Sequence, residues 1–138
     1  MKTFLLVIVL CFCGCAPELK YLDYEVEKSR SIEKPFEPVW NESLEWITLN
    51  AVSTKQISRE NGLIQLEFVP DSSMCDCGTW TDSQERHWKR TADFATAFLH
   101  ISSVGNASRV TVKVRFHNIY RCVSTGLFER MILDYLTK

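Results

Sequence analysis

The chain has little glycine and proline and no excess of charge of either sign. Its 138 residues include five glycines and four prolines, and 16 Lys and Arg residues stand against 17 Asp and Glu residues. These numbers exclude a collagen-like or low-complexity fibre, a disordered tail and a polybasic protein that binds nucleic acid. With 46% hydrophobic and 24% charged residues, the composition is typical of one globular domain.

Enzyme motifs are absent as well. The sequence contains no Gly-x-Ser-x-Gly elbow, Walker loop, dinucleotide-binding fingerprint or His-Glu-x-x-His motif. The sequence therefore identifies no nucleophile and no general base for an enzymatic reaction. The sequence predicts a protein that is not an enzyme, and it indicates no cofactor and no small-molecule substrate.

The N-terminus holds the one long apolar run. Residues 4–13 are all apolar and follow the positive charge of Lys2, but ten residues are too few for a permanent bilayer-spanning helix. A cleavage region of small residues follows, at Gly14, Cys15 and Ala16, and it completes the layout of a secretory signal peptide. We therefore expect residues 1–14 to be removed from the mature protein.

The end of this segment, Phe12-Cys13-Gly14-Cys15, resembles a bacterial lipobox, with Phe12 in place of the usual Leu and Cys13 in place of Ala or Ser. The resemblance implies that Cys15 becomes the first mature residue and carries a diacylglyceryl group. The residue after Cys15 is Ala16 and not Asp. In the sorting of enteric bacteria, this resembles a lipoprotein that is sent to the outer membrane. The alternative is an ordinary secretory signal cut near Cys15 or Ala16.

Two segments repeat apolar residues at helical spacing. The first predicts a helix over about 37–50, with Pro38 in its first turn. The second predicts a helix over about 125–137, for which Ser124 or Thr125 is available as the N-cap. The two apolar stripes are Phe36, Val39, Trp40, Leu44 and Ile47, and Phe128, Met131, Ile132, Tyr135 and Leu136.

Two hairpins are predicted from turn residues. Asn61-Gly62 as a two-residue turn places Ile57 opposite Leu66, between strands near 56–58 and 63–68. Gly105-Asn106 joins strands at about 93–103 and 108–119 and stacks four apolar pairs on one face. These pairs are Ile101–Val110, Leu99–Val112, Ala97–Val114 and Ala95–Phe116. The other face is wetter and pairs His100 with Thr111, Phe98 with Lys113 and Thr96 with Arg115.

These elements predict an α+β fold, a twisted antiparallel sheet of four or five strands with two helices packed on one face. We expect one domain over 35–138. Residues 15–34 would form the lipidated N-terminus and a tether, with a further edge strand near 21–26.

The order of elements, with Pro38-Val39-Trp40 opening the first helix and Glu60-Asn61-Gly62-Leu63-Ile64 at the first turn, resembles the helix-grip domains of bacterial envelope lipoproteins. The BamC-type lipoproteins of the outer-membrane β-barrel assembly machinery are the best-known example. The resemblance implies a non-enzymatic accessory that acts by contact with an envelope protein, and it carries over no catalytic residue. A cysteine-bearing loop departs from that family.

This loop, residues 70–92, is the long connection without a clear apolar period, and it contains Cys75 and Cys77. A bridge within Cys-x-Cys would be strained, so we expect Cys122, just after the last strand, to pair with one of them. Gly78 gives the backbone freedom next to Cys77 and favours Cys77 as the partner.

Other chemistry for the same cysteines stays open. Cys75, Cys77 and Cys122 with His87 would make a tetrahedral zinc site, although an oxidising envelope competes for the thiols. A thiol-redox role for Cys-x-Cys is a further alternative, as are free thiols.

The remaining candidate functional residues are one pair of histidines and one pair of tryptophans. We expect His100 and His117, on the wetter face of the second hairpin, to be solvated. Trp80 and Trp88 bracket a charged stretch and would form either a partner surface or, as we expect, a small core under the loop.

Overall fold

The computed structural model describes residues 21–81 and 83–138, so the predicted signal peptide and the lipidation site Cys15 lie outside the described residues. The side chains of residues 80 and 81 are likewise not described. The elements, in chain order, are β1 (Ser29–Ile32), α1 (Phe36–Leu49), β2 (Ser53–Ser58), β3 (Leu63–Phe68), β4 (Cys75–Asp76), β5 (Thr79–Thr81), β6 (His87–Lys89), β7 (Phe94–Val104), β8 (Ala107–His117), β9 (Val123–Ser124) and α2 (Leu127–Leu136).

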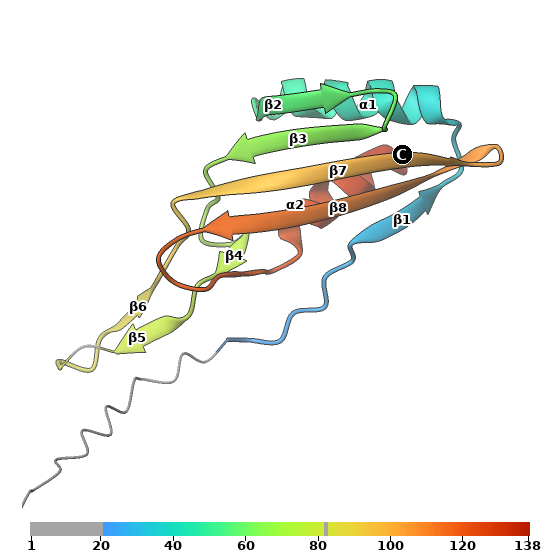
Figure 1. The fold of residues 1–138 in the computed structure, drawn as a ribbon. Helices are drawn as coiled ribbons and strands as arrows, with labels where there is room; N and C mark the ends of the chain where they lie inside the picture. Colours follow the sequence, from blue (N-terminus) through green and yellow to red (C-terminus); the bar gives the residue numbers. More distant parts are fainter. Residues whose placement is uncertain (1–20, 82) are drawn as a thin grey trace, which may run out of the picture.

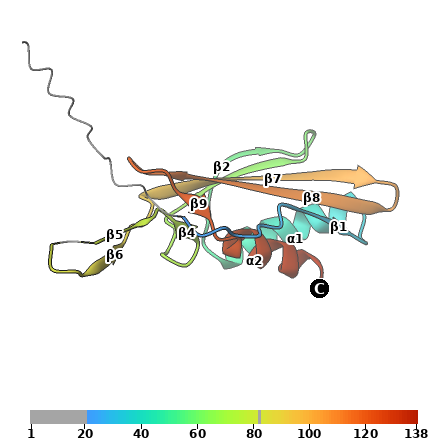
Figure 2. The ribbon, with the colours of Figure 1, turned by 90° about the horizontal axis from the view of Figure 1, so that it is seen from below.

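The main sheet has five strands in the order β1-β8-β7-β3-β2, and all its pairings are antiparallel (Figure 1). Both helices lie on the same face of the sheet, as Figure 2 shows with the sheet seen on edge. The fold is therefore α+β, as predicted. Within the described residues, no helix is long and apolar enough to cross a membrane.

The hairpin of β7 and β8 has the predicted register. Ile101 opposes Val110 and Leu99 opposes Val112, and these four side chains are almost completely buried under the helices. Gly105 turns the chain with a φ of +62°. Because the side chains of a strand alternate between faces, a slip of one residue would have moved this apolar set into water.

The predicted register of the β2–β3 hairpin is wrong, by two residues at Ile57 and by three beyond the bulge, at Thr54. Ile57 opposes Ile64, and Leu66 opposes Thr54 across a bulge at Lys55. The turn holds four residues, with the Gly62 N–H donating to the Arg59 carbonyl, and Gly62 adopts a φ of +60°. The wider turn lets Gly62 pack against the neighbouring strand β7. A shift of two residues keeps the same face of β2 toward the helices.

Both predicted helices are present. Helix α1 buries Val39, Trp40 and Ile47 from the predicted stripe. The N-cap residue of helix α2 is Gly126, with a left-handed φ of +81°, and not Ser124 or Thr125. The hydroxyls of Ser124 and Thr125 instead accept the backbone N–H groups of Gly126 and Leu127, at 3.0 Å and 3.4 Å. The Gly126 backbone lies against residues 25 and 26 of the N-terminal segment.

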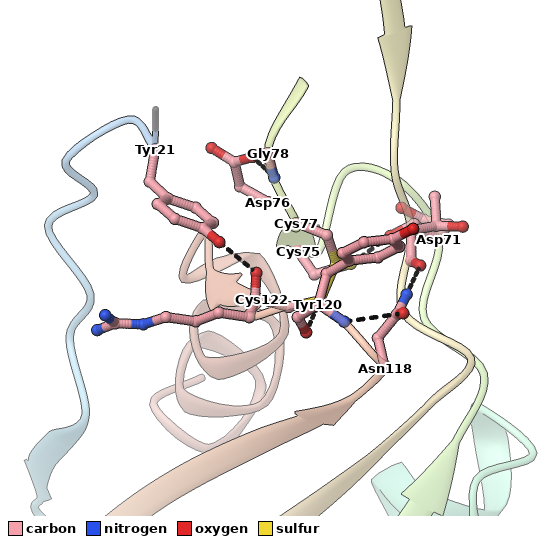
Figure 3. Close-up of a disulfide and its surroundings, with 11 residues drawn as sticks. Tyr21, Asp71, Cys75, Asp76, Cys77, Gly78, Asn118, Tyr120 and Cys122 are labelled. Atoms are coloured by element: carbon pink, nitrogen blue, oxygen red, sulfur yellow. Dashed lines mark hydrogen bonds between the residues drawn. A yellow bond between two sulfur atoms is a disulfide. The ribbon is translucent and has the colours of Figure 1, made fainter. Parts of the chain in front are cut away.

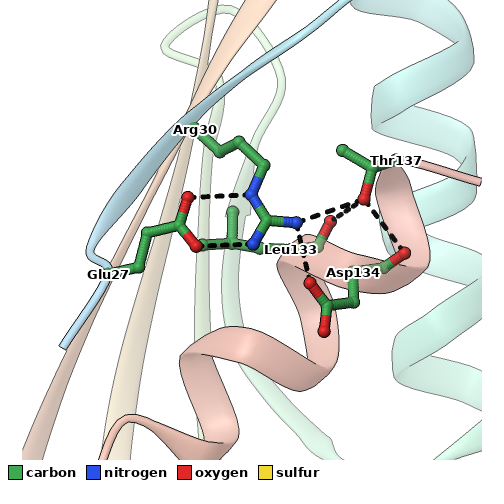
Figure 4. Close-up of polar contacts among 5 residues, drawn as sticks. All are labelled: Glu27, Arg30, Leu133, Asp134 and Thr137. Atoms are coloured by element: carbon green, nitrogen blue, oxygen red, sulfur yellow. Dashed lines mark hydrogen bonds and ion pairs between the residues drawn. The ribbon is translucent and has the colours of Figure 1, made fainter. Parts of the chain in front are cut away.

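The predicted edge strand near 21–26 is wrong, since the strand that joins the sheet is β1, at Ser29–Ile32. Ile32 is the apolar residue of this segment that enters the core, and it is 1% exposed. Arg30 also ties the segment to α2, with its Nη1 2.8 Å from Oδ1 of Asp134, while its Nε donates to Glu27 at 2.8 Å (Figure 4). The folded part of the chain therefore begins before residue 35, inside the predicted tether.

The long connection at 70–92 contains two short ladders. Strand β4 pairs with β9, next to the start of α2, and β5 pairs with β6. The β5–β6 arm extends away from the main sheet (Figures 1 and 2). The loop is thus held to the domain by β4 and, near its end, by the Asn118 side-chain amide, which donates to the Thr91 carbonyl at 2.5 Å.

Candidate functional site

A disulfide joins Cys77 to Cys122, with an S–S distance of 2.12 Å and 45 residues between the partners in sequence. The prediction that Cys122 pairs with a loop cysteine, and with Cys77 in preference to Cys75, is confirmed. The β4–β9 ladder explains the choice, because Cys75 opposes Ser124 and Asp76 opposes Val123. Continuing that register places Cys77 directly across from Cys122 (Figure 3). Opposed residues in an antiparallel pair are close enough for a bridge.

The third cysteine, Cys75, is a free thiol that is fully buried. Its sulfur lies 4.0 Å from Sγ of Cys77 and donates to the Asp71 carbonyl at 3.8 Å. Cys75 and Cys77 form a small second core with Ala92, against which Phe116 and Cys122 pack. A small core therefore lies under the loop, and it is built from cysteines and Ala92.

Asp76, between the two loop cysteines, organises the N-terminal segment. Its Oδ2 accepts hydrogen bonds from the Leu22 N–H and the Tyr24 hydroxyl, both at 3.2 Å, and its Oδ1 accepts from the Gly78 N–H at 2.9 Å. Burial, together with the negative charge of Asp76, raises the pKa of Tyr24. The Tyr21 hydroxyl also donates to the Arg121 carbonyl at 2.8 Å. Residues 21–24, which lead toward Cys15, are therefore bound to the cysteine cluster, that is, to the region around Cys75, Cys77 and Cys122.

Sequence reasoning missed Asp76 because one buried carboxylate in a loop has no pattern of its own. The available signal was the position of Asp76 between two cysteines, because both cysteines are buried in or next to the short strand β4.

The residues expected for a zinc site are not available as ligands in this arrangement. Cys77 and Cys122 are bonded to each other and have no thiolate to offer. His87 lies on β6 and is exposed. Across residues 21–81 and 83–138, no group of three or more His, Cys, Asp or Glu side chains could hold a metal ion.

The histidines of the second hairpin differ from each other. His100 is exposed, as expected. His117 is half-buried, with its Nε2 3.0 Å from the Thr96 hydroxyl and its ring stacked on Phe94 at 4.3 Å. The expectation of a merely solvated His117 is therefore wrong, because Phe94 covers it.

Trp80 and Trp88 oppose each other across the β5–β6 ladder. Trp88 is 47% exposed, and the Arg86 guanidinium lies 5.6 Å from its ring centre. Trp88 is therefore not part of a core under the loop, contrary to our expectation. The side chain of Trp80 lies outside what the structure describes.

A second feature is an apolar groove of about 460 Å³ where α1 and β3 end and α2 begins. Aromatic rings form part of its walls, and Asn50, Ser53 and Glu67 are polar members of the lining. Phe128 stacks on Phe68 with ring centres 4.3 Å apart and meets Trp46 edge-on at 5.6 Å. These rings come from three elements that are distant in sequence, so no local pattern could have shown the groove.

Exposed apolar side chains surround this groove. Val69 is 80% exposed, Phe94 is 40% exposed and Met131 is 37% exposed, and all three line it. The one ionisable side chain in the lining, Glu67, is paired with Lys55 at 2.9 Å. A clustered apolar surface of this kind is typical of a site of protein contact.

No family model matches the chain, and no curated protein matches it. Among solved structures, the chain is similar to the protein TTHA0849 from Thermus thermophilus. The sequences are 16% identical, the match covers 81% of this chain and 86% of that one, and the TM-score is 0.36.

Proposed function

We propose that this chain is a lipid-anchored protein of the bacterial cell envelope, a non-enzymatic accessory that acts by protein contact in outer-membrane or cell-envelope assembly. The anchor is a diacylated Cys15 in the outer membrane, and the domain is a relative of the BamC-type helix-grip lipoproteins. The observation that carries the contact function is the apolar groove, because exposed Val69, Phe94 and Met131 gather around one aromatic-walled hollow.

The disulfide supports the export step of this proposal. A bond between cysteines 45 residues apart persists in an oxidising compartment, and such bonds are rare in the cytosol. The N-terminal signal pattern and the disulfide are independent features of the chain, and both fit an extracytoplasmic protein.

The docked N-terminal segment supports a short anchor. Tyr21 and Leu22 are already bound to the cysteine cluster. A fully extended chain spans at most about 3.5 Å per residue, so the roughly six steps from Cys15 to Tyr21 reach about 20 Å. A lipid on Cys15 therefore holds the domain close to the membrane surface.

The partner that suits the groove is a protein segment with apolar side chains and no charge. Aromatic walls bind such side chains by removing apolar surface from water. A charged partner side chain would lose its hydration against Trp46, Phe68 and Phe128 with no free opposite charge in the lining to replace it.

Affinity purification from native membranes tests the contact, with Val69→Asp as the groove variant. Val104→Asp is the matched control, since Val104 is also exposed but lies at the β7–β8 turn, at the far end of β7 from Phe94. We expect a copurifying envelope protein to be lost with Val69→Asp and retained with Val104→Asp. Equal recovery with both variants would refute a role for the groove.

Labelling cells with a palmitate analogue tests the anchor. We expect incorporation into the natural chain and none into a Cys15→Ser variant. Labelling that survives Cys15→Ser would show that the lipid is elsewhere or absent from this cysteine.

A second candidate function, a thiol-redox protein, is favoured by one distance. Sγ of Cys75 lies 4.0 Å from Sγ of Cys77. Attack by the Cys75 thiolate would form a Cys75–Cys77 bond, break the Cys77–Cys122 bond and leave the Cys122 sulfur to take up the proton that Cys75 released. This exchange has no net oxidation or reduction, so a redox cycle adds a second exchange, between the released Cys122 thiolate and a disulfide of a partner protein.

Alkylation of the native, oxidised protein distinguishes this candidate. A redox function predicts alkylated Cys122 together with a Cys75–Cys77 bond in the peptide map. A Cys77–Cys122 crosslink with no alkylated Cys122 would overturn it.

A further inference from the structure

The five-stranded sheet has one covered and one open face. The helices lie on one side only, and the other side of β7, β8 and β3 carries no layer of the described chain (Figure 2). On β8 the covered face holds Ser108, Val110 and Val112, each at most 1% exposed. The residues that alternate with them, 109, 111, 113 and 115, therefore point to the open face.

Three of these outward positions are basic. Arg109, Lys113 and Arg115 are all exposed, and within the described part of the chain none of them has an ion pair. On the helix side, by contrast, three acidic residues form ion pairs with basic ones. Those pairs are Arg30–Asp134, Lys34–Glu42 and Arg59–Glu37.

Acidic residues are nearly absent from the open face. Among the outward positions of the five strands, Glu67 is the one carboxylate, and Lys55 neutralises it at 2.9 Å. The open face thus has a surplus of three positive charges on a chain whose formal net charge is −1. Unmatched charge gathered on one face of a near-neutral protein attracts an anionic partner.

An aromatic side chain lies beside the basic ones. Phe98 directly opposes Lys113 on this face. Phe98 is half-buried, although no layer of the described residues covers it. Large apolar side chains at such positions are unfavourable against water alone.

We propose that this open face of β7 and β8 docks on the anionic headgroups of a phospholipid bilayer. The bases lie along one strand, so from Arg109 to Arg115 they span about 20 Å at roughly 3.3 Å per residue. Lipid headgroups move laterally and can meet any spacing of charges, whereas a folded acidic protein or a nucleic acid must match it. The neighbouring ring of Phe98 would contact the boundary between headgroups and acyl chains. The inference rests on the face alone and stands without a lipid on Cys15.

Binding to vesicles tests the proposal. The mature chain, residues 15–138, is used with Cys15→Ser, so that neither the apolar residues 4–13 nor an acyl group contributes. Vesicles of phosphatidylcholine are compared with vesicles that also contain phosphatidylglycerol. Each Lys or Arg near an anionic bilayer contributes about a five-fold factor in binding. We expect Lys113→Gln with Arg115→Gln to lower binding to the anionic vesicles about 30-fold, and the addition of Arg109→Gln to lower it about 150-fold.

The matched control removes two charges from the helix side. Arg130→Gln with Lys138→Gln changes the net charge equally at exposed positions, and we expect a change of less than about two-fold. Because all five residues are exposed, the urea midpoint should remain that of the natural chain, which shows that the variants fold.

Three results would overturn the inference. The first is equal binding to neutral and anionic vesicles, and the second is an equal loss with the control variant. The third is no vesicle binding while a soluble polyanion such as heparin binds through Lys113 and Arg115, which would assign the face to an acidic macromolecule. Persistence of the groove partner in these variants separates this inference from the proposed contact function.

Discussion

Replacing both Cys77 and Cys122 with alanine is expected to lower the free energy of unfolding by about 4 kcal/mol. The disulfide closes a loop of 45 residues. In the chain-entropy model, a crosslink of this length removes that much conformational freedom from the unfolded chain at 25 °C. Domains of this size are stable by about 5–15 kcal/mol, so the loss is a large part of the total.

Urea unfolding of the oxidised protein and of the double variant measures this difference. Cys75→Ala is the matched control, because it removes a buried sulfur from the same small core and keeps the disulfide. We expect it to lose only about 1 kcal/mol, the usual effect of deleting one small buried group.

The reasoning fails if the double variant unfolds within about 1 kcal/mol of the Cys75→Ala variant. It also fails if mass spectrometry of the non-reduced, alkylated protein finds Cys75, Cys77 and Cys122 all alkylated. The expected result is a Cys77–Cys122 crosslink and an alkylated Cys75.

Two further predictions concern a turn and an ion pair. A Cβ at Gly62 would lie 1.9 Å from the Ile101 carbonyl oxygen, whereas one at Gly105 meets nothing within 4 Å. Gly62→Ala should therefore destabilise by about 3 kcal/mol or more, and Gly105→Ala by about 1–2 kcal/mol of left-handed strain, in urea unfolding; equal losses would contradict the argument. Hydrogen bonds from Arg30 hold the pKa of Glu27 below its ordinary value of 4.5, so the pair stabilises above pH 4.5 and this contribution is lost as the pH falls through the lower, folded value. Because Glu27 is partly exposed, we expect Glu27→Gln to lower the free energy of unfolding by less than about 1 kcal/mol at about pH 7 and by nothing measurable at about pH 2; an unchanged difference at both pH values would count against it.

Local sequence patterns were sufficient for the elements whose partners are adjacent in the chain. The β7–β8 hairpin has four apolar pairs that coincide in one register only, so burial and turn chemistry agree. The two helices follow from their apolar stripes for the same reason. The pairing of Cys122 with Cys77 was also predictable, although the flexibility of Gly78 was a weaker argument than the β4–β9 register that places the two cysteines opposite each other.

Elements that depend on contacts between distant segments were decided by the tertiary structure. The β2–β3 turn is four residues wide because Gly62 packs against Ile101 of β7, which the Asn61-Gly62 pair could not indicate. Strand β1 lies at 29–32 because Ile32 fits the core beside β8, while the segment before it binds Asp76 through its backbone and a tyrosine.

The candidate sites divide in the same way. The cysteines and the signal segment are visible as residue types at close spacing. The apolar groove and the basic face are not, because each is assembled from side chains that approach one another only when the sheet forms. A short sequence window records which residues alternate or repeat, but which faces end up covered by helices depends on packing across the whole domain.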